Sequence, residues 1–218
     1  MRGLRRRRSP DPALLLLRSV CHELRPPMAT LASLVRALET TRSEPRHSEL
    51  ARLAAEHASH AEAVLRQAAA AAQGLDAGAE HPVPLHRVLP AATAVVPGDR
   101  LTVAVTQSAG RCLVPPQHLR QILINLLTNA AAYAPSGTPI RLRARTDLCR
   151  LRLTVADAGR PNRDLTVALN RRTPPPDSNG LGLWVVRHLA ARHGGSVRAR
   201  ALSPSGLAVE VSLPRRPK

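Results

Sequence analysis

The sequence contains almost no aromatic residues. Tyr133 and Trp184 are its two aromatic side chains, and phenylalanine is absent. The core must therefore be built from leucine, valine, isoleucine and alanine. Two rings are also too few for the stacking platform that binds single-stranded nucleic acid, and no recognition-helix motif is present. We expect no specific nucleic-acid partner.

Cysteine and long apolar runs are also scarce. Cys21, Cys112 and Cys149 are widely spaced and form no CxxC pair, which excludes a zinc ribbon and a disulfide framework. The longest apolar run near the N-terminus, Ala13–Leu17, is too short to span a bilayer, and Arg18 interrupts it without a cleavage site. We expect a soluble, cytoplasmic chain without a membrane span.

Lysine occurs once, at Lys218, so arginine carries nearly all of the positive charge and the formal net charge is +17. This arginine usage has two interpretations. It can reflect a GC-rich genome, or it can form a basic surface that attracts nucleotides, acidic proteins, nucleic acid or anionic lipid. The charge alone does not choose between them.

The first third of the chain predicts a helical hairpin. After a basic, disordered tail at residues 1–10, Asp11 and Pro12 favour a helix start, and the first helix is expected to end near Thr41. A turn containing Pro45 and a second helix over 48–73 complete a hairpin at 11–76, before a linker at 77–84.

Apolar residues in the first helix repeat with alternating spacings of three and four, as in a coiled-coil seam. The repeat comprises Leu14, Leu17, Cys21, Leu24, Met28, Leu31, Val35 and Leu38. Because a two-helix hairpin cannot cover such a stripe by itself, we predict a homodimer that forms a four-helix bundle.

From residue 85 to 214 the spacing of apolar residues is that of a helix in some segments and that of a strand in others. Helices are expected at 85–96, 116–134 and 181–193, and strands at 101–105, 111–114, 139–145, 150–157, 196–201 and 206–213. The turn at 107–110 separates the first two strands. The second unit is thus an α/β sandwich with a mixed or antiparallel sheet, and the whole chain is α+β.

His22 and Glu23 form the first stretch that can carry chemistry. His22 follows a seam residue, so we expect it beside the buried stripe and within reach of solvent. A neutral imidazole is a competent nucleophile, and an adjacent carboxylate can hold its second N–H. The pair Pro26–Pro27 is expected to kink or loosen the helix.

Three further stretches follow in the second unit. Asn125 and Asn129 share one helix face, and their amide oxygens suit Mg²⁺. Asp157 and Gly159 end a strand, where a carboxylate can accept an exocyclic amine beside a planar base. Residues 179–183 place glycines at a helix start, where phosphates can approach free N–H groups.

Taken together and in this order, these stretches resemble the sensor histidine kinases of two-component systems. His22 to Met28 looks like the H-box, Asn125 to Tyr133 the N-box, and Asp157 to Gly159 the G1 box. Residues 180–183 with 193–195 look like the G2 region. The resemblance implies a dimerisation and phosphotransfer hairpin followed by a GHKL-type ATP-binding catalytic domain at 85–214.

The resemblance also implies roles for individual residues. His22 would accept the phosphoryl group from Mg-ATP, Glu23 would orient it, and a response-regulator aspartate would receive it. Asn129 would hold Mg²⁺ and residues 160–179 would form a lid. The remaining nucleotide-binding residues implied are Asn125, Tyr133, Asp157, Gly159, Gly180, Leu181, Gly182 and Leu183.

Four positions depart from the family pattern. Pro26 replaces a Thr or Asn associated with phosphatase activity, and Ala132 replaces a basic residue. Pro161 and Ser178 replace glycines of the G1 and G2 regions. These departures leave an alternative open, in which the chain is a non-catalytic, nucleotide-binding dimer that acts as a scaffold or regulatory partner.

Overall fold

The computed structural model describes residues 12–41, 43–76, 81–147, 149–160, 181–203 and 205–215. The tail expected at 1–10 and the helix cap expected at Asp11 lie outside these residues. The chain divides into two compact units, and the main boundary between them falls at Leu75–Asp76. Each unit is described by itself.

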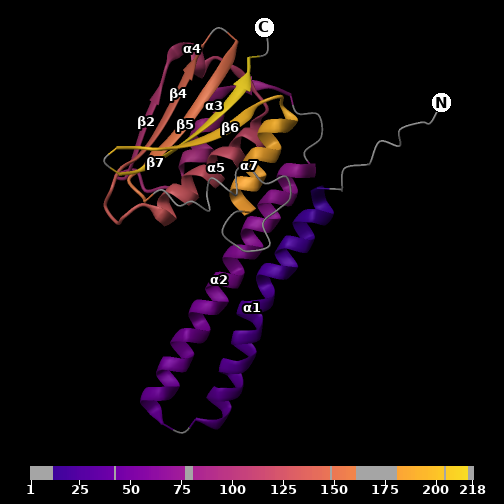
Figure 1. Cartoon of the computed structure of the whole chain (residues 1–218), viewed down its shortest axis with the longest axis vertical. Helices are drawn as coiled ribbons and strands as arrows, with labels where there is room; N and C mark the ends of the chain where they lie inside the picture. Colours follow the sequence, from indigo (N-terminus) through magenta and orange to yellow (C-terminus); the bar gives the residue numbers. More distant parts are fainter. Residues whose placement is uncertain are drawn as a thin grey trace, which may run out of the picture. The chain divides into compact units, whose positions relative to one another are not determined.

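The first unit contains two long helices, α1 (Pro12–Thr40) and α2 (Glu44–Asp76), which run antiparallel and are joined at 41–43 (Figure 1). The helical hairpin expected from the sequence is present. The expected turn around Pro45 is wrong, because α2 begins at Glu44. Proline is tolerated in a first helical turn, where its missing N–H would have no partner. Helix α1 continues over Pro26 and Pro27.

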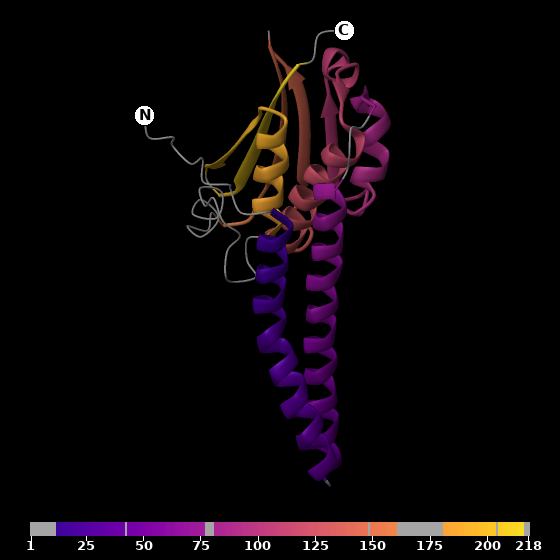
Figure 2. The same ribbon diagram turned by 90° about the vertical axis from the view of Figure 1, so that its right-hand side faces the viewer.

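The buried stripe of α1 differs from its apolar seam. Val20, Glu23 and Pro27 are buried, and the stripe continues through the half-buried Thr30 and Leu34. Helix α2 has a matching stripe in which Ala61 and Val64 are buried. These stripes form the facing sides of the hairpin, which Figure 2 shows from a second direction.

The apolar seam residues therefore do not all pack inside the hairpin. Leu24, Leu31 and Leu38 are half-buried, whereas Leu14, Leu17, Cys21, Met28 and Val35 are exposed. The exposed members form a stripe along one side of α1, next to the side that faces α2.

The second unit is an α/β sandwich. Its main sheet has the order β2-β4-β5-β7-β6, in which β2 is parallel to β4 and all other neighbours are antiparallel. The strands are β2 (Leu101–Val105), β4 (Ile140–Thr146), β5 (Arg150–Asp157), β6 (Ser196–Ala201) and β7 (Leu207–Pro214). The mixed sheet and the α+β class agree with the sequence prediction.

Three helices cover one face of this sheet: α3 (Leu85–Thr93), α5 (Pro116–Tyr133) and α7 (Leu181–Arg192) (Figure 1). Helix α5 lies centrally and packs against α3, α7, β4 and β5. Its apolar side chains Leu119, Ile122, Leu123 and Leu127 are almost fully buried. They meet alternate strand residues such as Leu142 and Leu153. The core is mainly aliphatic, as expected from the sequence, but it also contains the ring of Trp184 from α7, which is 3% exposed.

Short elements near the start of this unit differ from the sequence prediction. Residues 107–110, expected as a turn, form the short helix α4 (Gln107–Gly110), because the hydroxyl of Thr106 caps it by accepting the Ala109 N–H. Part of the expected linker forms β1 (Val83–Pro84), which pairs with β3 (Leu113–Val114).

Two element boundaries in the structure also differ from those predicted from the sequence. The strand expected at 111–114 is confined to β3, and α3 ends at Thr93 instead of Val96. No helix in the described part of the chain is both long and apolar enough to cross a membrane.

Gly206 fixes the turn between β6 and β7. Its φ is +127°, and a Cβ built on it would lie 2.5 Å from the carbonyl oxygen of Asp157. The turn is closed by the Leu202 N–H, which donates to the Gly206 carbonyl. Both the backbone angle and the close approach therefore require glycine.

We predict that Gly206→Ala lowers the free energy of unfolding by about 1–3 kcal/mol, because it adds backbone strain and a clash. Gly98→Ala is the matched control, since a Cβ there meets nothing within 4 Å. Urea unfolding of both variants measures the difference. Equal stability of the two variants would contradict this account of the turn.

Candidate functional site

His22 and Glu23 lie on different sides of α1. His22 is exposed, whereas Glu23 is only 6% exposed and belongs to the stripe that faces α2. The separation follows from helix geometry, since adjacent side chains point about 100° apart around the axis. The structure thus presents the imidazole to solvent and turns the neighbouring carboxylate inward.

The carboxylate of Glu23 has unusual surroundings. Its Oε2 atom is buried and has no hydrogen-bond partner among the described residues. Burial raises the pKa of Glu23 above its usual range, because desolvation disfavours the charged form. A carboxylate of this kind takes up a proton more readily than an exposed one.

The two prolines affect the backbone beside these residues. Pro26 and Pro27 carry no N–H, so they supply no helical hydrogen bond to the carbonyls of His22 and Glu23, four residues earlier. The helical turn that carries the histidine therefore has fewer backbone bonds than the rest of α1.

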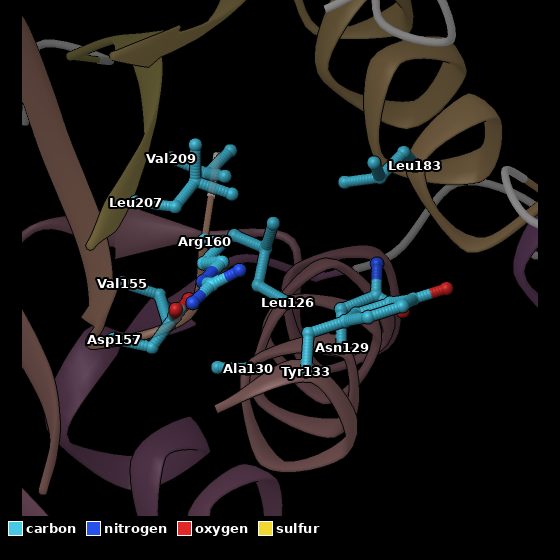
Figure 3. A pocket seen from close by; sticks show the side chains of 10 residues that line it. All are labelled: Leu126, Asn129, Ala130, Tyr133, Val155, Asp157, Arg160, Leu183, Leu207 and Val209. Carbon is cyan, nitrogen blue, oxygen red and sulfur yellow. The ribbon is translucent and has the colours of Figure 1, made fainter. Parts of the chain in front are cut away.

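A pocket opens in the second unit where the end of β5 and the start of β7 face the C-terminal half of α5 and the start of α7 (Figure 3). Its volume is about 440 Å³, including the part open to solvent. The lining is mostly apolar with a few polar groups, as in sites for small organic molecules. It comprises Leu126, Asn129, Ala130, Tyr133, Val155, Asp157, Arg160, Leu183, Leu207 and Val209.

Asp157 lines the pocket at the end of β5, near Arg160 (Figure 3). The N–H of Gly159 donates to its Oδ1 over 2.7 Å, which fixes the direction of the carboxylate. Burial raises the pKa of Asp157, and the hydrogen bond from Gly159 partly opposes this effect. A half-buried, oriented carboxylate can accept a hydrogen bond from an amine on a planar base.

Gly159 permits a close backbone approach next to Asp157. A Cβ at this position would lie 2.8 Å from Asp157 Oδ1 and 2.9 Å from the carbonyl oxygen of Tyr133. Any larger residue would displace either the carboxylate or the end of α5. The glycine therefore keeps both walls of the pocket in place.

Asn125 and Asn129 project from the same side of α5. Asn125 is 4% exposed, and Gln121 Nε2 donates to its Oδ1 over 3.2 Å. Its Nδ2 is buried without a partner among the described residues, while Asn129 reaches the pocket lining. The unpaired Nδ2 of Asn125 is a ready donor for a polar group, and the amide oxygen of Asn129 is of the type that suits a hard cation held with phosphates.

The structure thus brings together Asn129, Tyr133, Asp157 and Leu183 around one pocket, with Asn125 behind it and Gly159 supporting Asp157. Leu181 and Gly182 lie at the start of α7. Gly180, Pro161 and Ser178 lie outside the described residues, as does the expected lid at 160–179 except for Arg160, which lines the pocket. Ala132 is exposed.

Five pocket residues were not selected from the sequence as binding residues: Leu126, Ala130, Val155, Leu207 and Val209. Arg160 belongs to the segment that was expected to form the lid. The alternation in β5 and β7 showed which strand residues face the core. It did not show that the last inward residues of two non-adjacent sequence segments meet, because that depends on strands β5 and β7 being neighbours.

Comparisons with known proteins connect this pocket to a family. Residues 115–217 match the family described as histidine kinase-, DNA gyrase B- and HSP90-like ATPase. An uncharacterized sensor-like histidine kinase of Rhizobium meliloti is 32% identical over 126 residues, covering 54% of this chain and 24% of the relative. The sensor-like histidine kinase SenX3 of Mycolicibacterium smegmatis is 29% identical over 134 residues, 56% of this chain and 35% of the relative. The chain thus spans about a quarter to a third of the length of these curated relatives.

Solved structures agree with the sequence matches. The mycobacterial sensor histidine kinase MprB superposes with a TM-score of 0.51 and 26% identity, over 64% of this chain and all of that structure. Full-length ShkA in complex with AMPPNP superposes with a TM-score of 0.55 and 26% identity, over 95% of this chain and 46% of ShkA. The sandwich, its pocket and these matches support one conclusion: residues 115–217 belong to a GHKL-type ATPase domain, and the chain is similar to the sensor histidine kinases of two-component systems.

Proposed function

We propose that the chain is an ATP-dependent protein-histidine kinase that phosphorylates His22 and passes the phosphoryl group to a response-regulator aspartate. In this proposal residues 11–76 are the dimerisation and phosphotransfer hairpin, 77–84 are the linker and 85–214 are the catalytic domain. The protein acts as a cytoplasmic homodimer. The observation that carries the proposal is the pocket in which Asp157, Gly159 and Asn129 combine the polar groups that a nucleotide requires.

Different pocket residues bind different parts of ATP, which is the substrate. Ionised Asp157 accepts a hydrogen bond from the exocyclic amine of adenine, while Leu126, Val155 and Val209 line the apolar space for the base. Asn129, supported by Asn125, holds Mg²⁺ together with the phosphates. When bound, the metal neutralises phosphate charge, which is the main requirement of phosphoryl transfer.

Four further residues complete the proposed nucleotide site. Tyr133 packs near the base. Gly180, Leu181 and Gly182 cradle the phosphates at the helix start, where free N–H groups and the helix dipole favour anions.

His22 is the proposed acceptor because it is the exposed member of the His-Glu pair. Its neutral ring nitrogen attacks the γ-phosphorus, a phosphorus–nitrogen bond forms, and the bond to the ADP oxygen breaks. Glu23 holds the second ring N–H and takes its proton. Because Glu23 faces the hairpin interior, its side chain must turn outward to do so, and the two prolines that follow weaken this turn of helix.

The scaffold alternative is less well supported. The matched relatives are sensor-like histidine kinases, and the described part of the pocket retains both asparagines, the aspartate and its glycine. Two of the departures, Pro161 and Ser178, fall outside the described residues, and the exposed Ala132 does not line the pocket.

We predict that the full chain incubated with γ-labelled ATP and Mg²⁺ acquires an acid-labile label, and that His22→Ala abolishes it, because no other side chain is the proposed acceptor. His47→Ala is the matched control, since His47 is an exposed histidine of the neighbouring helix. Label that survives in His22→Ala would overturn the proposed acceptor. Nucleotide binding without any label would favour the scaffold alternative.

We predict that Asp157→Asn weakens ATP binding by about 10- to 100-fold, because a hydrogen bond to a charged acceptor is lost. The raised pKa of Asp157 adds a pH dependence. Since the ionised form binds the amine, wild-type affinity should fall as the pH is lowered through this raised pKa, starting above the range of an ordinary aspartate.

Calorimetric titration with a non-hydrolysable ATP analogue measures both effects. Asp99→Asn, at an exposed aspartate outside the pocket, is the control and should bind like the wild type. An Asp157→Asn protein with wild-type affinity would remove Asp157 from the proposed site.

We predict that the exposed stripe of α1 is the dimer contact. Met28 and Val35 are 55% and 49% exposed and lie one heptad apart. Replacing both by glutamate should weaken dimerisation at least ~100-fold, because unpaired charges would be buried in the bundle. Ala29→Glu with Ser33→Glu adds the same charge at exposed positions outside the seam. Analytical sedimentation measures the dimer dissociation constant of both double variants. Equal constants in the two variants would rule out this stripe as the dimer contact.

A further inference from the structure

The open face of the main sheet carries an array of arginines. Alternate residues of each strand point away from α3, α5 and α7, and on β4, β5 and β6 most of these positions are arginine. The arginines of this face are Arg141, Arg143, Arg145, Arg150, Arg152, Arg198 and Arg200. We call this set the arginine face.

Two carboxylates, those of Asp147 and Glu210, lie on the same face, and both form ion pairs with Arg152. Arg152 Nε lies 2.7 Å from Asp147 Oδ2, and its Nη1 lies 2.9 Å from Glu210 Oε1. Glu210 also lies 3.8 Å from Arg145. The other five arginines form no ion pair within the described residues, although Arg150 donates to Ser212 Oγ over 3.5 Å. The face therefore has a large excess of positive charge.

The register spreads this charge in two dimensions. Neighbouring strands are about 4.8 Å apart and alternate residues on one strand about 6.7 Å apart. Strand β7, between β5 and β6, contributes the small residues Ala208 and Ser212, which lie beneath the longer side chains of its neighbours. In the backbone register of β6 and β7, Arg198 lies opposite Glu210, and Arg200 lies opposite Ala208.

Within the described strands, Pro214 at the end of β7 is the one apolar side chain larger than alanine on this face, and it lies opposite Arg150. The other positions without arginine are Thr102, Ala104, Thr154, Ala156, Ser196, Ala208, Glu210 and Ser212. A protein–protein interface usually has an aromatic or large apolar centre, and a single-stranded nucleic acid needs aromatic rings for stacking. Neither partner fits a face that, in the described strands, is made of guanidinium groups and small residues, with one glutamate, one proline at the end of β7 and no aromatic ring.

We propose that the arginine face docks on an anionic lipid surface. A bilayer presents its phosphates as a flat, two-dimensional array, so arginines on all of β4, β5 and β6 can engage it together, each contributing to the attraction. A nucleic-acid duplex is curved, and its major groove is about 12 Å wide, narrower than these strands and β7 together. It would meet only part of the face.

The test is co-sedimentation of the full chain with vesicles of equal parts phosphatidylglycerol and phosphatidylcholine, compared with pure phosphatidylcholine. Binding should occur on the anionic vesicles alone and weaken with salt. The triple variant Arg143→Gln, Arg198→Gln, Arg200→Gln should bind roughly 100-fold more weakly, because three cations near the surface are removed. Circular dichroism confirms that the variant is folded.

Two controls remove the same charge elsewhere. The first is Arg87→Gln, Arg111→Gln, Arg120→Gln, at exposed positions on α3, after α4 and on α5. The second is Arg5→Gln, Arg6→Gln, Arg7→Gln, in the N-terminal basic run. Both should bind within about 5-fold of the wild type, since net charge alone contributes little specificity.

Three results would overturn the proposal. Absence of binding to the anionic vesicles would rule out an anionic lipid surface as the partner of this face. Equal losses in the face variant and in either control show that net charge or the N-terminal run is responsible. Tighter binding to duplex DNA than to vesicles, lost in the face variant, assigns the arginine face to nucleic acid. None of these results bears on phosphorylation of His22, so the two proposals fail independently.

Discussion

The burial of helix α5 between the sheet and its two neighbouring helices is the constraint on which the catalytic unit depends. Leu119, Ile122, Leu123 and Leu127 lock this helix to the core, with almost no exposed surface. The same helix must carry Asn125 and Asn129 to the pocket. A polar side chain on a helix locked in this way has little freedom to move, so the direction of these amides is set by the packing of leucine and isoleucine several residues away.

The pocket also depends on two glycines from separate turns that both contact Asp157. Gly159 donates its N–H to the carboxylate and leaves room for the carbonyl of Tyr133, whereas Gly206 approaches the backbone carbonyl of Asp157. The end of α5, the end of β5 and the start of β7 are therefore held together around one residue. Mutations at Gly206 are expected to affect nucleotide binding through the position of Asp157, although Gly206 does not line the pocket.

Most of the fold could be predicted from periodicity because the long elements have clear patterns. The alternation of leucine and arginine in β4 and β5 marks both strands, and the apolar spacing in 116–134 marks α5. The predictions that were wrong concern short elements and a helix start that contains a proline at its second residue. Helix α4 depends on one cap from Thr106, β1 depends on pairing with a distant strand, and α2 begins one residue before Pro45. A local pattern cannot reveal such long-range or single-bond effects.

The candidate site was predictable where a residue type is chemically distinctive, and less so where position alone matters. His22, Asn129 and Asp157 could be proposed because imidazole, amide and carboxylate groups suit nucleophilic attack, Mg²⁺ and amine recognition, and because the stretches that contain them occur in the order of the histidine kinase motifs. The inward direction of Glu23 could not be inferred from its neighbour, because the stripe that faces α2 is shifted by one residue from the apolar seam. Because of that shift, one side of α1 packs against α2, and the adjacent apolar side is available to pack against another helix. It also places a carboxylate of raised pKa next to the proposed phosphoacceptor. If Glu23 is the orienting base, exchange of its side chain between the hairpin interior and solvent limits how often His22 is activated, and the two prolines that follow lower the cost of that exchange.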